Sequence, residues 1–142
     1  MKSSSESRPS SIDSPAPVHG PTNPENSFDK IRRFAAVVEL KPEKERLYRE
    51  LHAEVWPGVV QAIKKANISN YSIFVASIEG RRYLFSYFEY TGSDPGKDFA
   101  SIAADPTTRD EWWPLTDACQ QVLDGTPDGE QWLPLEQLMH IS

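Results

Sequence analysis

Two apolar segments separated by a short turn place the strongest constraint on how this chain folds. Asn70–Ile78 and Tyr83–Tyr90 are rich in aromatic and β-branched residues and are typical of strands. The intervening segment Glu79–Arg81 contains a glycine and is only long enough for a tight turn. The sequence therefore predicts an antiparallel β-hairpin, and the rest of the chain has to pack around it.

A strand and a helical region are predicted before the hairpin. Phe34–Leu40 is an apolar run rich in residues that favour a buried strand. Apolar residues then recur at four-residue spacing, the pattern of an amphipathic helix that begins at Pro42 and stops near Asn67. Pro57 forces a break or kink in this helix after Trp56.

A similar pattern follows the hairpin. Gly92–Lys97 is rich in turn residues, and a short helix is predicted over Phe99–Ala104. A further helix is expected from about Pro106 to Gly125, and a last strand over roughly Leu133–Ile141.

The resulting order β-α-β-β-α-β predicts the α+β fold class in its ferredoxin-like form. In this arrangement one antiparallel sheet carries its helices on a single face. The aromatic side chains of the hairpin suggest that the second face is buried as well. We therefore expect a homodimer that forms through the sheet.

Composition narrows the possible partners of the protein. The 142 residues include 15 Lys and Arg against 21 Asp and Glu, which gives a formal net charge of -6. This charge argues against binding to nucleic acid or to an anionic membrane surface, because both need clustered basic residues. A single cysteine, Cys119, excludes an internal disulfide framework. No apolar run reaches the roughly 18 residues that span a bilayer, and we expect a cytoplasmic protein.

The N-terminal segment differs from the rest of the chain. Residues 1–31 are rich in serine and proline and contain one aromatic residue, Phe28. Such a segment buries too little apolar surface to offset the entropy lost on ordering. The sequence therefore predicts a disordered tail over residues 1–31 and one folded domain over residues 32–142.

Three aromatic side chains on the first helix are the first candidates for chemistry. Tyr48, His52 and Trp56 are spaced four residues apart, which places them on one helix face. Histidine titrates near neutral pH and can both donate and accept a proton, as general acid–base catalysis requires. The alternative is a histidine at the edge of the core that binds a backbone carbonyl.

Four further residues are candidates for binding a polar ligand. Trp112 and Trp113 are adjacent, so on a regular helix they diverge by roughly 100°; one is expected to pack inward and the other to line a cavity, where an indole can cover the apolar face of a sugar. Both could instead fill a dimer interface. The hydroxyl of Tyr71 could reach a pocket or be buried by packing, and Asp117 could orient a base or lie in solvent.

Motifs for cofactor and metal chemistry do not occur. The chain contains neither a glycine-rich phosphate loop nor a paired-histidine metal motif, and no Ser or Cys stands in a recognisable nucleophile motif. We therefore expect any activity to need no cofactor and no metal.

Together these segments resemble the L-rhamnose mutarotase family. The likeness covers Arg32–Ser142 and rests on five pieces that occur in the family's order. These pieces are Tyr48-x-x-x-His52-x-x-x-Trp56-Pro57, Asn70-Tyr71-Ser-Ile, Leu84-Phe85 with Glu89, Trp112-Trp113, and Thr116-Asp117. The sequence departs from the family at Gly58, where a Glu is usual, and at Pro114 after the tryptophan pair.

The resemblance implies a dimeric α+β barrel that interconverts the α and β anomers of L-rhamnose without a cofactor. By motif, His52 matches the family's proton donor. Tyr48, Tyr71, Trp112 and Trp113 match its substrate-contacting residues. Ring opening needs two proton transfers, and a tyrosine, Asp117 or a water could provide the second.

Two other functions stay open from the sequence. One is a cofactor-independent monooxygenase on the same dimeric architecture, which would need a deeper apolar pocket for an aromatic substrate. The other is a non-catalytic ligand-binding dimer. The row of Tyr48, His52 and Trp56 favours a polyol over an aromatic ligand.

Overall fold

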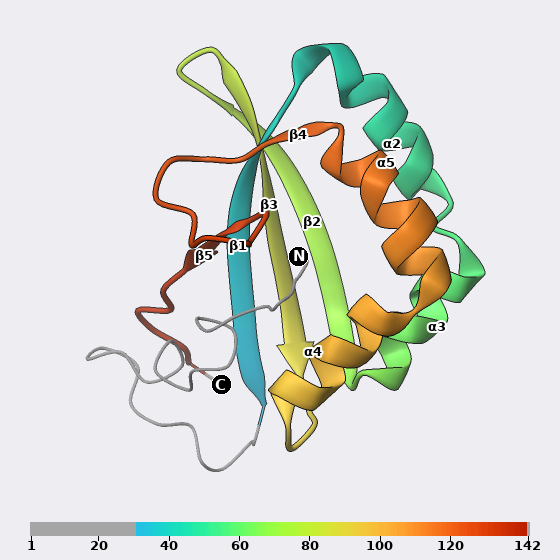
Figure 1. The fold of residues 1–142 in the computed structure, drawn as a ribbon. Helices are drawn as coiled ribbons and strands as arrows, with labels where there is room; N and C mark the ends of the chain where they lie inside the picture. Colours follow the sequence, from blue (N-terminus) through green and yellow to red (C-terminus); the bar gives the residue numbers. More distant parts are fainter. Residues whose placement is uncertain (1–30, 142) are drawn as a thin grey trace.

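A computed structural model describes residues 31–141, and these residues form an antiparallel sheet covered by helices (Figure 1). The five strands are β1 (Arg32–Leu40), β2 (Ile68–Ile78), β3 (Arg81–Tyr90), β4 (Gln120–Gln121) and β5 (Leu133–Leu135). They are ordered β2-β3-β1-β4, and β5 also pairs with β1. This order confirms the predicted ferredoxin-like arrangement. The tail predicted over residues 1–31 lies outside the described residues, except for Ile31.

The predicted hairpin is formed by β2 and β3. Ile78 pairs with Arg81, so the turn itself consists of Glu79 and Gly80. Both turn residues have positive φ, 50° and 83°, as a two-residue turn that follows the twist of the strands requires. Glycine adopts such a φ without steric cost, which explains why Gly80 stands there.

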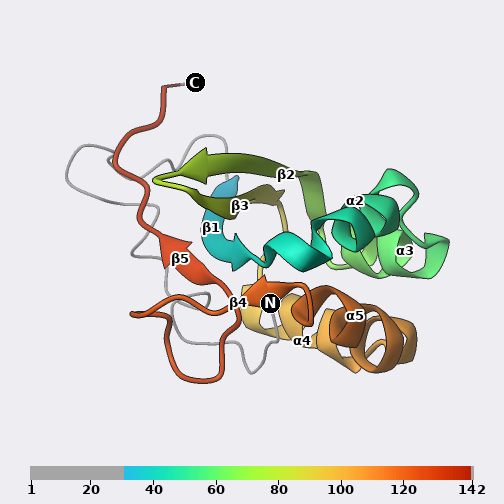
Figure 2. The same ribbon diagram turned by 90° about the horizontal axis from the view of Figure 1, so that it is seen from above.

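The helices all lie on one face of the sheet (Figure 1). They are a 3-10 helix η2 (Pro42–Lys44), α2 (Glu45–Ala53), α3 (Pro57–Lys65), α4 (Pro95–Ala104), a π-helix η3 (Thr108–Trp112) and α5 (Trp113–Asp117). Seen from above, α2 lies beside α3 and α4 beside α5 (Figure 2). None of the helices in the described part of the chain is long and apolar enough to cross a membrane.

The break predicted at Pro57 is confirmed. Helix α2 ends at Ala53, three residues of non-helical chain follow, and α3 begins at Pro57. Proline is tolerated at the first position of a helix, where its missing N–H has no intrahelical partner to lose. The break turns the chain between α2 and α3 and places Trp56 outside both helices.

Two groups of buried side chains form the core between the sheet and the helices. One consists of Val38, Leu40, Tyr48, Leu84, Cys119 and Trp132. The other consists of Ala66, Ile68, Phe88, Tyr90, Phe99 and Ile102. Ile73 and Tyr71, neighbours in β2, pack against the first and the second group respectively. The candidate site lies where these two groups meet.

The helix predicted to end near Gly125 ends earlier, at Asp117. Beyond it, the carbonyl of Cys119 accepts a hydrogen bond from the Lys41 N–H at 2.9 Å. Gln120 and Gln121 then pair with the end of β1 as strand β4. Pairing with the sheet therefore stops the helix before its sequence pattern ends.

Two other predicted boundaries are corrected. The last strand stops at Leu135 instead of Ile141, and the side chain of Ile141 is 79% exposed. Helix α4 begins at Pro95, within the segment expected to be a turn, because the Asp94 carboxylate accepts a hydrogen bond from the Lys97 N–H at 3.1 Å. Such a cap satisfies one of the free N–H groups at a helix start.

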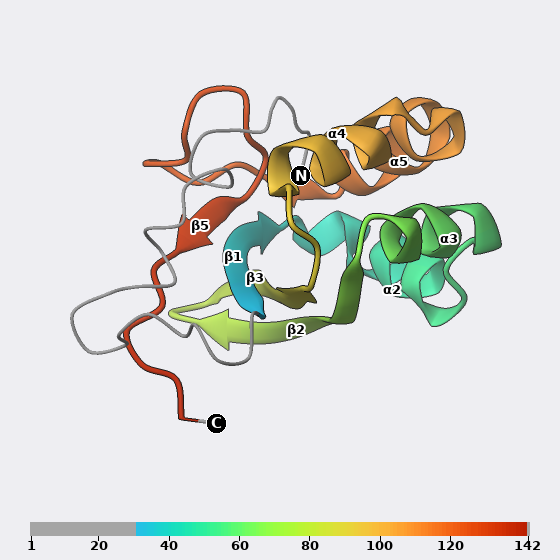
Figure 3. The same ribbon diagram turned by 90° about the horizontal axis from the view of Figure 1, so that it is seen from below.

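The second face of the sheet carries no helix in the described residues. Strand β5 and the chain that follows it extend on this side of the molecule (Figure 3). Because side chains alternate between the two faces of a strand, Phe74 of β2 and its pairing partner Phe85 of β3 belong to this face. Phe74 is 60% exposed. We call this the outer face of the sheet.

Candidate active site

All six residues predicted as site residues line one small cavity of about 50 Å³. Tyr48 and His52 come from α2, Tyr71 comes from β2, and the remaining three come from the π-helix and α5: Trp112, Trp113 and Asp117. The structure therefore brings together side chains from three segments that are far apart in the sequence. We call this cavity the polar chamber.

His52 is held by its own helix. Its Nδ1 lies 2.8 Å from the carbonyl oxygen of Tyr48, one turn earlier. A carbonyl oxygen only accepts, so Nδ1 carries the proton and Nε2 has a free electron pair in the neutral ring. Burial lowers the pKa of His52 below its ordinary value, and the hydrogen bond to the carbonyl opposes this only in part. His52 is therefore a neutral base near pH 7.

Tyr48 is the polar side chain packed most closely on His52. The two rings are stacked with their centroids 4.1 Å apart, and Tyr48 is 5% exposed. Burial raises the pKa of the Tyr48 phenol far above its ordinary value, the nearby Tyr71 and Asp117 add to the increase, and a hydrogen bond with Gln120 opposes it. The phenol therefore keeps its proton and acts as a hydrogen-bond donor.

The tryptophan pair sits on an unusually wide helical turn. The N–H of Trp113 bonds to the carbonyl of Thr108, five residues earlier, which is the pattern of a π-helix. Pro114 explains this turn, because a proline ring in a regular α-helix clashes with the carbonyl four residues before it. The Asp105 carboxylate fixes the start of the segment by accepting hydrogen bonds from the N–H and hydroxyl of Thr108, at 3.0 and 2.8 Å.

Both tryptophans contribute to the cavity walls, whereas their adjacency on a regular helix favoured one packed inward and one at a cavity. Trp112 is 6% exposed, and its ring lies 5.3 Å from that of His52. Trp113 packs against the second core group and also lines the chamber. The wide turn accounts for this, because it reduces the angle between adjacent side chains. Trp56 is not a wall residue of the chamber; its ring contacts Trp112 edge-on at 5.0 Å and supports it.

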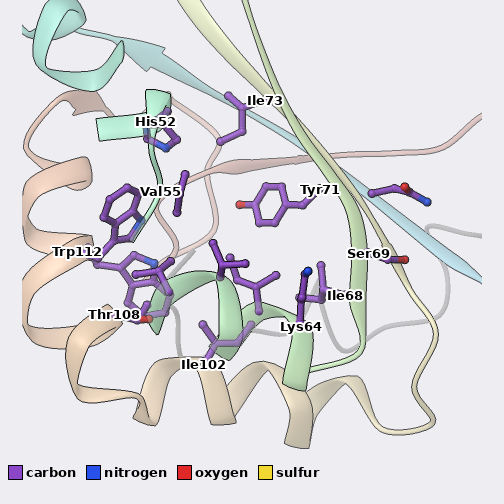
Figure 4. A pocket seen from close by; sticks show the side chains of 15 residues that line it. His52, Val55, Lys64, Ile68, Ser69, Tyr71, Ile73, Ile102, Thr108 and Trp112 are labelled. Carbon is purple, nitrogen blue, oxygen red and sulfur yellow. The ribbon is translucent and has the colours of Figure 1, made fainter. Parts of the chain in front are cut away.

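Tyr71 lies on the same strand face as Ile73, at an irregular point of β2. The register with β3 shifts between Ser69 and Ser72, and Asn70 has a positive φ of 51°. A bulge of this kind bends the strand and redirects a side chain. In Figure 4 the Tyr71 hydroxyl points into the cavity, towards His52 and Trp112.

Four further residues line the chamber that the sequence did not identify as site residues. They are Ile73, Thr116, Gln120 and Trp132. Gln120 accepts a hydrogen bond from the Gln131 amide at 3.0 Å, and its side chain also bonds to Tyr48. Thr116 stands in one of the family-like pieces, whereas Gln120 and Trp132 lie in segments whose pattern gave no sign of a role.

A second, larger cavity of about 470 Å³ adjoins the chamber (Figure 4). His52, Tyr71, Ile73, Trp112 and Trp113 line both cavities. The additional walls are mostly aliphatic side chains from the α2–α3 region, β2 and α4. In residues 31–141 no group of three or more His, Cys, Asp and Glu side chains is placed to hold a metal ion.

The geometry defines a class of site. A neutral histidine base, two phenols and a carboxylate converge with indole rings on one chamber of an α+β domain. Phenols and amides hydrogen-bond hydroxyl groups, and indole rings cover apolar C–H faces. The arrangement is suited to acid–base chemistry on a small molecule that carries hydroxyl groups.

Comparisons with known proteins agree with this class. The sequence profile of the L-rhamnose mutarotase family matches residues 33–141. The chain is 28% identical over 111 residues to the L-rhamnose mutarotase of Acidiphilium cryptum, covering 78% of this chain and 99% of the relative. It is 30% identical over 102 residues to that of Leptothrix cholodnii, covering 72% and 89% of the two chains. The protein belongs to the L-rhamnose mutarotase family.

The fold agrees with a solved structure of the same family. The crystal structure of the L-rhamnose mutarotase from Formosa agariphila superposes with a TM-score of 0.56 at 25% sequence identity. The match covers 78% of this chain and 99% of that chain. The family resemblance predicted from the motifs is confirmed.

Proposed function

We propose that this protein is a mutarotase that interconverts the α and β anomers of L-rhamnose. Its membership in the family supports the reaction and the sugar. The observation that carries the proposal is the state of His52: a neutral ring with its tautomer set by the Tyr48 carbonyl, at the wall of a chamber lined by hydroxyl-binding groups. This is the state that a general base needs at neutral pH.

The reaction begins with proton transfer to His52. Nε2 takes the proton of the hydroxyl on C1, the electron pair of that O–H bond forms the aldehyde C=O, and the bond from C1 to the ring oxygen breaks. The ring oxygen receives a proton and becomes a hydroxyl group. Rotation about the C1–C2 bond then presents the other face of the aldehyde. Ring closure reverses both proton transfers: His52 gives its proton back to the oxygen on C1, and the other anomer forms. His52 therefore acts as the proton donor that the family motif implies during ring closure.

Two phenols on the chamber wall carry a proton for the ring oxygen, those of Tyr48 and Tyr71. The third predicted candidate, Asp117, acts on Tyr48 as a carboxylate and in that form has no proton to give. Tyr48 keeps its proton because burial raises the pKa of its phenol, so a hydrogen bond from Tyr48 can stabilise negative charge that develops on oxygen. Trp112 and Trp113 hold the apolar face of the sugar in this proposal.

Saturation-transfer NMR on equilibrated L-rhamnose tests the function directly. The wild type is expected to accelerate α/β exchange above the uncatalysed rate. His52→Ala is expected to lose about 10²–10⁴-fold of that acceleration, the usual contribution of a positioned general base. His52→Gln is the matched control for packing, since a glutamine amide can still donate to the Tyr48 carbonyl but cannot take a proton. Equal activity of the wild type and both variants would contradict the role of His52.

We also propose that the protein is a homodimer formed through the outer face of the sheet. Support comes from two aromatic side chains of this face, Phe74, which is 60% exposed, and the half-buried Phe85 opposite it. Leu138 and Met139, in the chain beyond β5, are also 60% and 63% exposed. Exposed apolar surface of this extent marks interaction sites. A cytoplasmic location stays a prediction from the sequence.

The monooxygenase alternative has one observation in its favour. It needs a deep apolar pocket, and the cavity of about 470 Å³ next to the chamber is lined largely by aliphatic side chains. Oxygen uptake with aromatic substrates separates the two functions. The mutarotase proposal expects no uptake above background, together with accelerated anomer exchange.

A further inference from the structure

The larger cavity shares five wall residues with the polar chamber but differs from it in chemistry. Away from the shared walls it is lined by Val55, Val59, Val60, Ile63, Ile68 and Ile102. We call the space between these six side chains the annex. They come from the segment before α3, from α3 itself, from β2 and from α4. Three of them, Val59, Ile68 and Ile102, are almost fully buried, so the core of the domain fixes this wall.

The annex wall offers few hydrogen-bond partners to the hydroxyl groups of a ligand. Thr108 contributes a polar side chain, but its hydroxyl proton is donated to the Asp105 carboxylate at 2.8 Å. Lys64, Ser69 and Asn70 line the cavity where the chain is exposed, at its outer end. A sugar hydroxyl placed against the aliphatic side chains would lose its hydrogen bonds to water, which is unfavourable.

The size of the larger cavity also indicates a ligand group other than the sugar ring. A volume of about 470 Å³ falls in the range of roughly 300–1,000 Å³ that is typical of pockets for drug-sized molecules. A single pyranose ring with its hydroxyl groups is smaller than such molecules. The chamber, at about 50 Å³, is too small for a whole ring, so the ring extends into the part of the larger cavity that is lined by His52, Trp112 and Trp113, where the reaction needs it. The annex therefore has room for a hydrocarbon group that is attached to the sugar.

The proposed reaction restricts where such a group can be attached. Ring opening needs a free hydroxyl on C1 and an unmodified ring oxygen. A substituent on the oxygen of C2, C3 or C4 leaves both groups intact, so the bonds made and broken are the same as for the free sugar. A substituent on the C1 oxygen would prevent the reaction.

We propose that the annex binds a short alkyl or acyl group carried on O2, O3 or O4 of a reducing 6-deoxyhexose. The substrates of this enzyme then include O-substituted sugars as well as the free monosaccharide. The inference rests on the proposed mutarotase function and extends it to a substrate class. Each methylene group that enters the annex is expected to strengthen binding about three- to fourfold.

The test compares L-rhamnose with its 2-O-, 3-O- and 4-O-butyl ethers as substrates in saturation-transfer NMR. At least one butyl ether is expected to show a KM at least tenfold lower than that of L-rhamnose, with acceleration of its anomer exchange. The position of the butyl group that gives the gain then identifies how the ring lies in the chamber.

Variants that fill the annex give a second readout. Val60→Phe and Ile63→Phe each place an aromatic ring at a half-buried wall position of the annex. Both are expected to lower the ratio of kcat/KM for the preferred butyl ether to kcat/KM for L-rhamnose by about tenfold or more. Val122→Phe is the matched control: this valine is 42% exposed and does not line the cavity, so the ratio is expected to be unchanged.

The outcomes separate the two proposals. If L-rhamnose itself is not accelerated, the mutarotase function fails. If L-rhamnose is accelerated but every butyl ether binds no better than L-rhamnose, the annex proposal is overturned and the function stands. The annex proposal is also overturned if Val60→Phe reduces kcat/KM equally for both substrates, because the annex would then be part of the site for the ring. The substrate series uses wild-type protein, so the test does not depend on the variants folding.

Discussion

At the scale of single residues, one backbone carbonyl decides what His52 can do. The carbonyl of Tyr48 holds the proton on Nδ1, and burial keeps the ring neutral because it lowers the pKa. The same burial raises the pKa of the neighbouring Tyr48 phenol. Burial therefore lowers the pKa of His52 and raises the pKa of Tyr48, although the two rings are in contact. The histidine becomes an acceptor and the phenol becomes a donor, which are the two roles that ring opening requires.

The pH dependence of catalysis follows from this assignment. The pKa of folded His52 lies below its ordinary value of 6.5, so the ring is neutral at pH 7 and gains a proton only as the pH falls below that value. The acceleration of L-rhamnose exchange, corrected for the uncatalysed rate, is expected to be constant at neutral and alkaline pH and to decline only at a pH below the ordinary pKa of histidine. An acceleration that increases on acidification would show that His52 acts first as an acid.

Protein stability is expected to change with pH in the same direction. The unfolded chain takes up the histidine proton at a higher pH than the folded chain, so this group lowers stability as the pH drops below about 6.5. Thermal melts of the wild type and His52→Gln over the same pH range check this. The melting temperature of the variant is expected to decline less on acidification.

The predicted site residues that a local motif carries all lie on one chamber, although their roles stay predictions. Tyr48, His52 and Trp112 stand at spacings that a single helix or a known motif defines. Gln120 and Trp132 could not be found this way. They reach the chamber only because β4 and the loop before β5 return to β1, and such long-range pairing leaves no periodic pattern in the sequence.

At the scale of elements, proline residues set the positions of the site's aromatic rings. Pro57 ends the first helical region and frees Trp56 to support Trp112. Pro114 accompanies the π-turn that lets Trp112 and Trp113 line one cavity. The sequence predicted the break at Pro57 but not the π-turn, because the expected directions of Trp112 and Trp113 assume a regular α-helix. Predicted boundaries also failed where capping by Asp94 or pairing with β1 determined them.

Replacing Pro114 with alanine tests the role of the π-turn. Pro114→Ala restores an N–H group and removes the clash with the preceding turn, so the segment can relax to a regular α-helix. The two indole rings would then diverge, and KM for L-rhamnose is expected to rise about tenfold, which corresponds to about 1.4 kcal/mol of binding free energy. The melting temperature is expected to stay the same or increase, since alanine favours helix.

The control for this substitution is Pro127→Ala, in the loop before β5. Its KM is expected to match the wild type, because Pro127 does not line either cavity. An unchanged KM in Pro114→Ala would mean that the contacts of Trp112 with Trp56 and His52 hold the rings without the proline.

At the scale of the whole molecule, the fold gives the two faces of the sheet different cover. The face towards the helices holds both core groups, with the chamber at their junction. The outer face carries apolar side chains that the described residues do not cover with helices. The order of elements predicted this division from the sequence, because a ferredoxin-like sheet receives its helices on one side only. Which apolar side chains remain exposed depends on the strand register, which the sequence alone left undefined.

A charge on the outer face is expected to prevent dimer formation. In the wild type, light scattering after gel filtration should give a mass of twice the 16.0 kDa of one chain. Phe74→Lys places an ammonium group in the centre of the proposed interface, opposite Phe85. Burying an unpaired charge costs several kcal/mol, so the variant is expected to elute as a monomer with a lower melting temperature.

Val122→Lys provides the matched control for Phe74→Lys. Val122 is also an exposed apolar residue, at 42%, but it lies after β4 and outside the sheet. This variant is expected to keep the wild-type mass. A monomeric wild type would contradict the dimer, and equal dissociation by both lysine variants would mean that the interface is not centred on the outer face. Because anomer exchange is measured on the same samples, activity of the Phe74→Lys monomer also shows whether one chain is sufficient for a complete site.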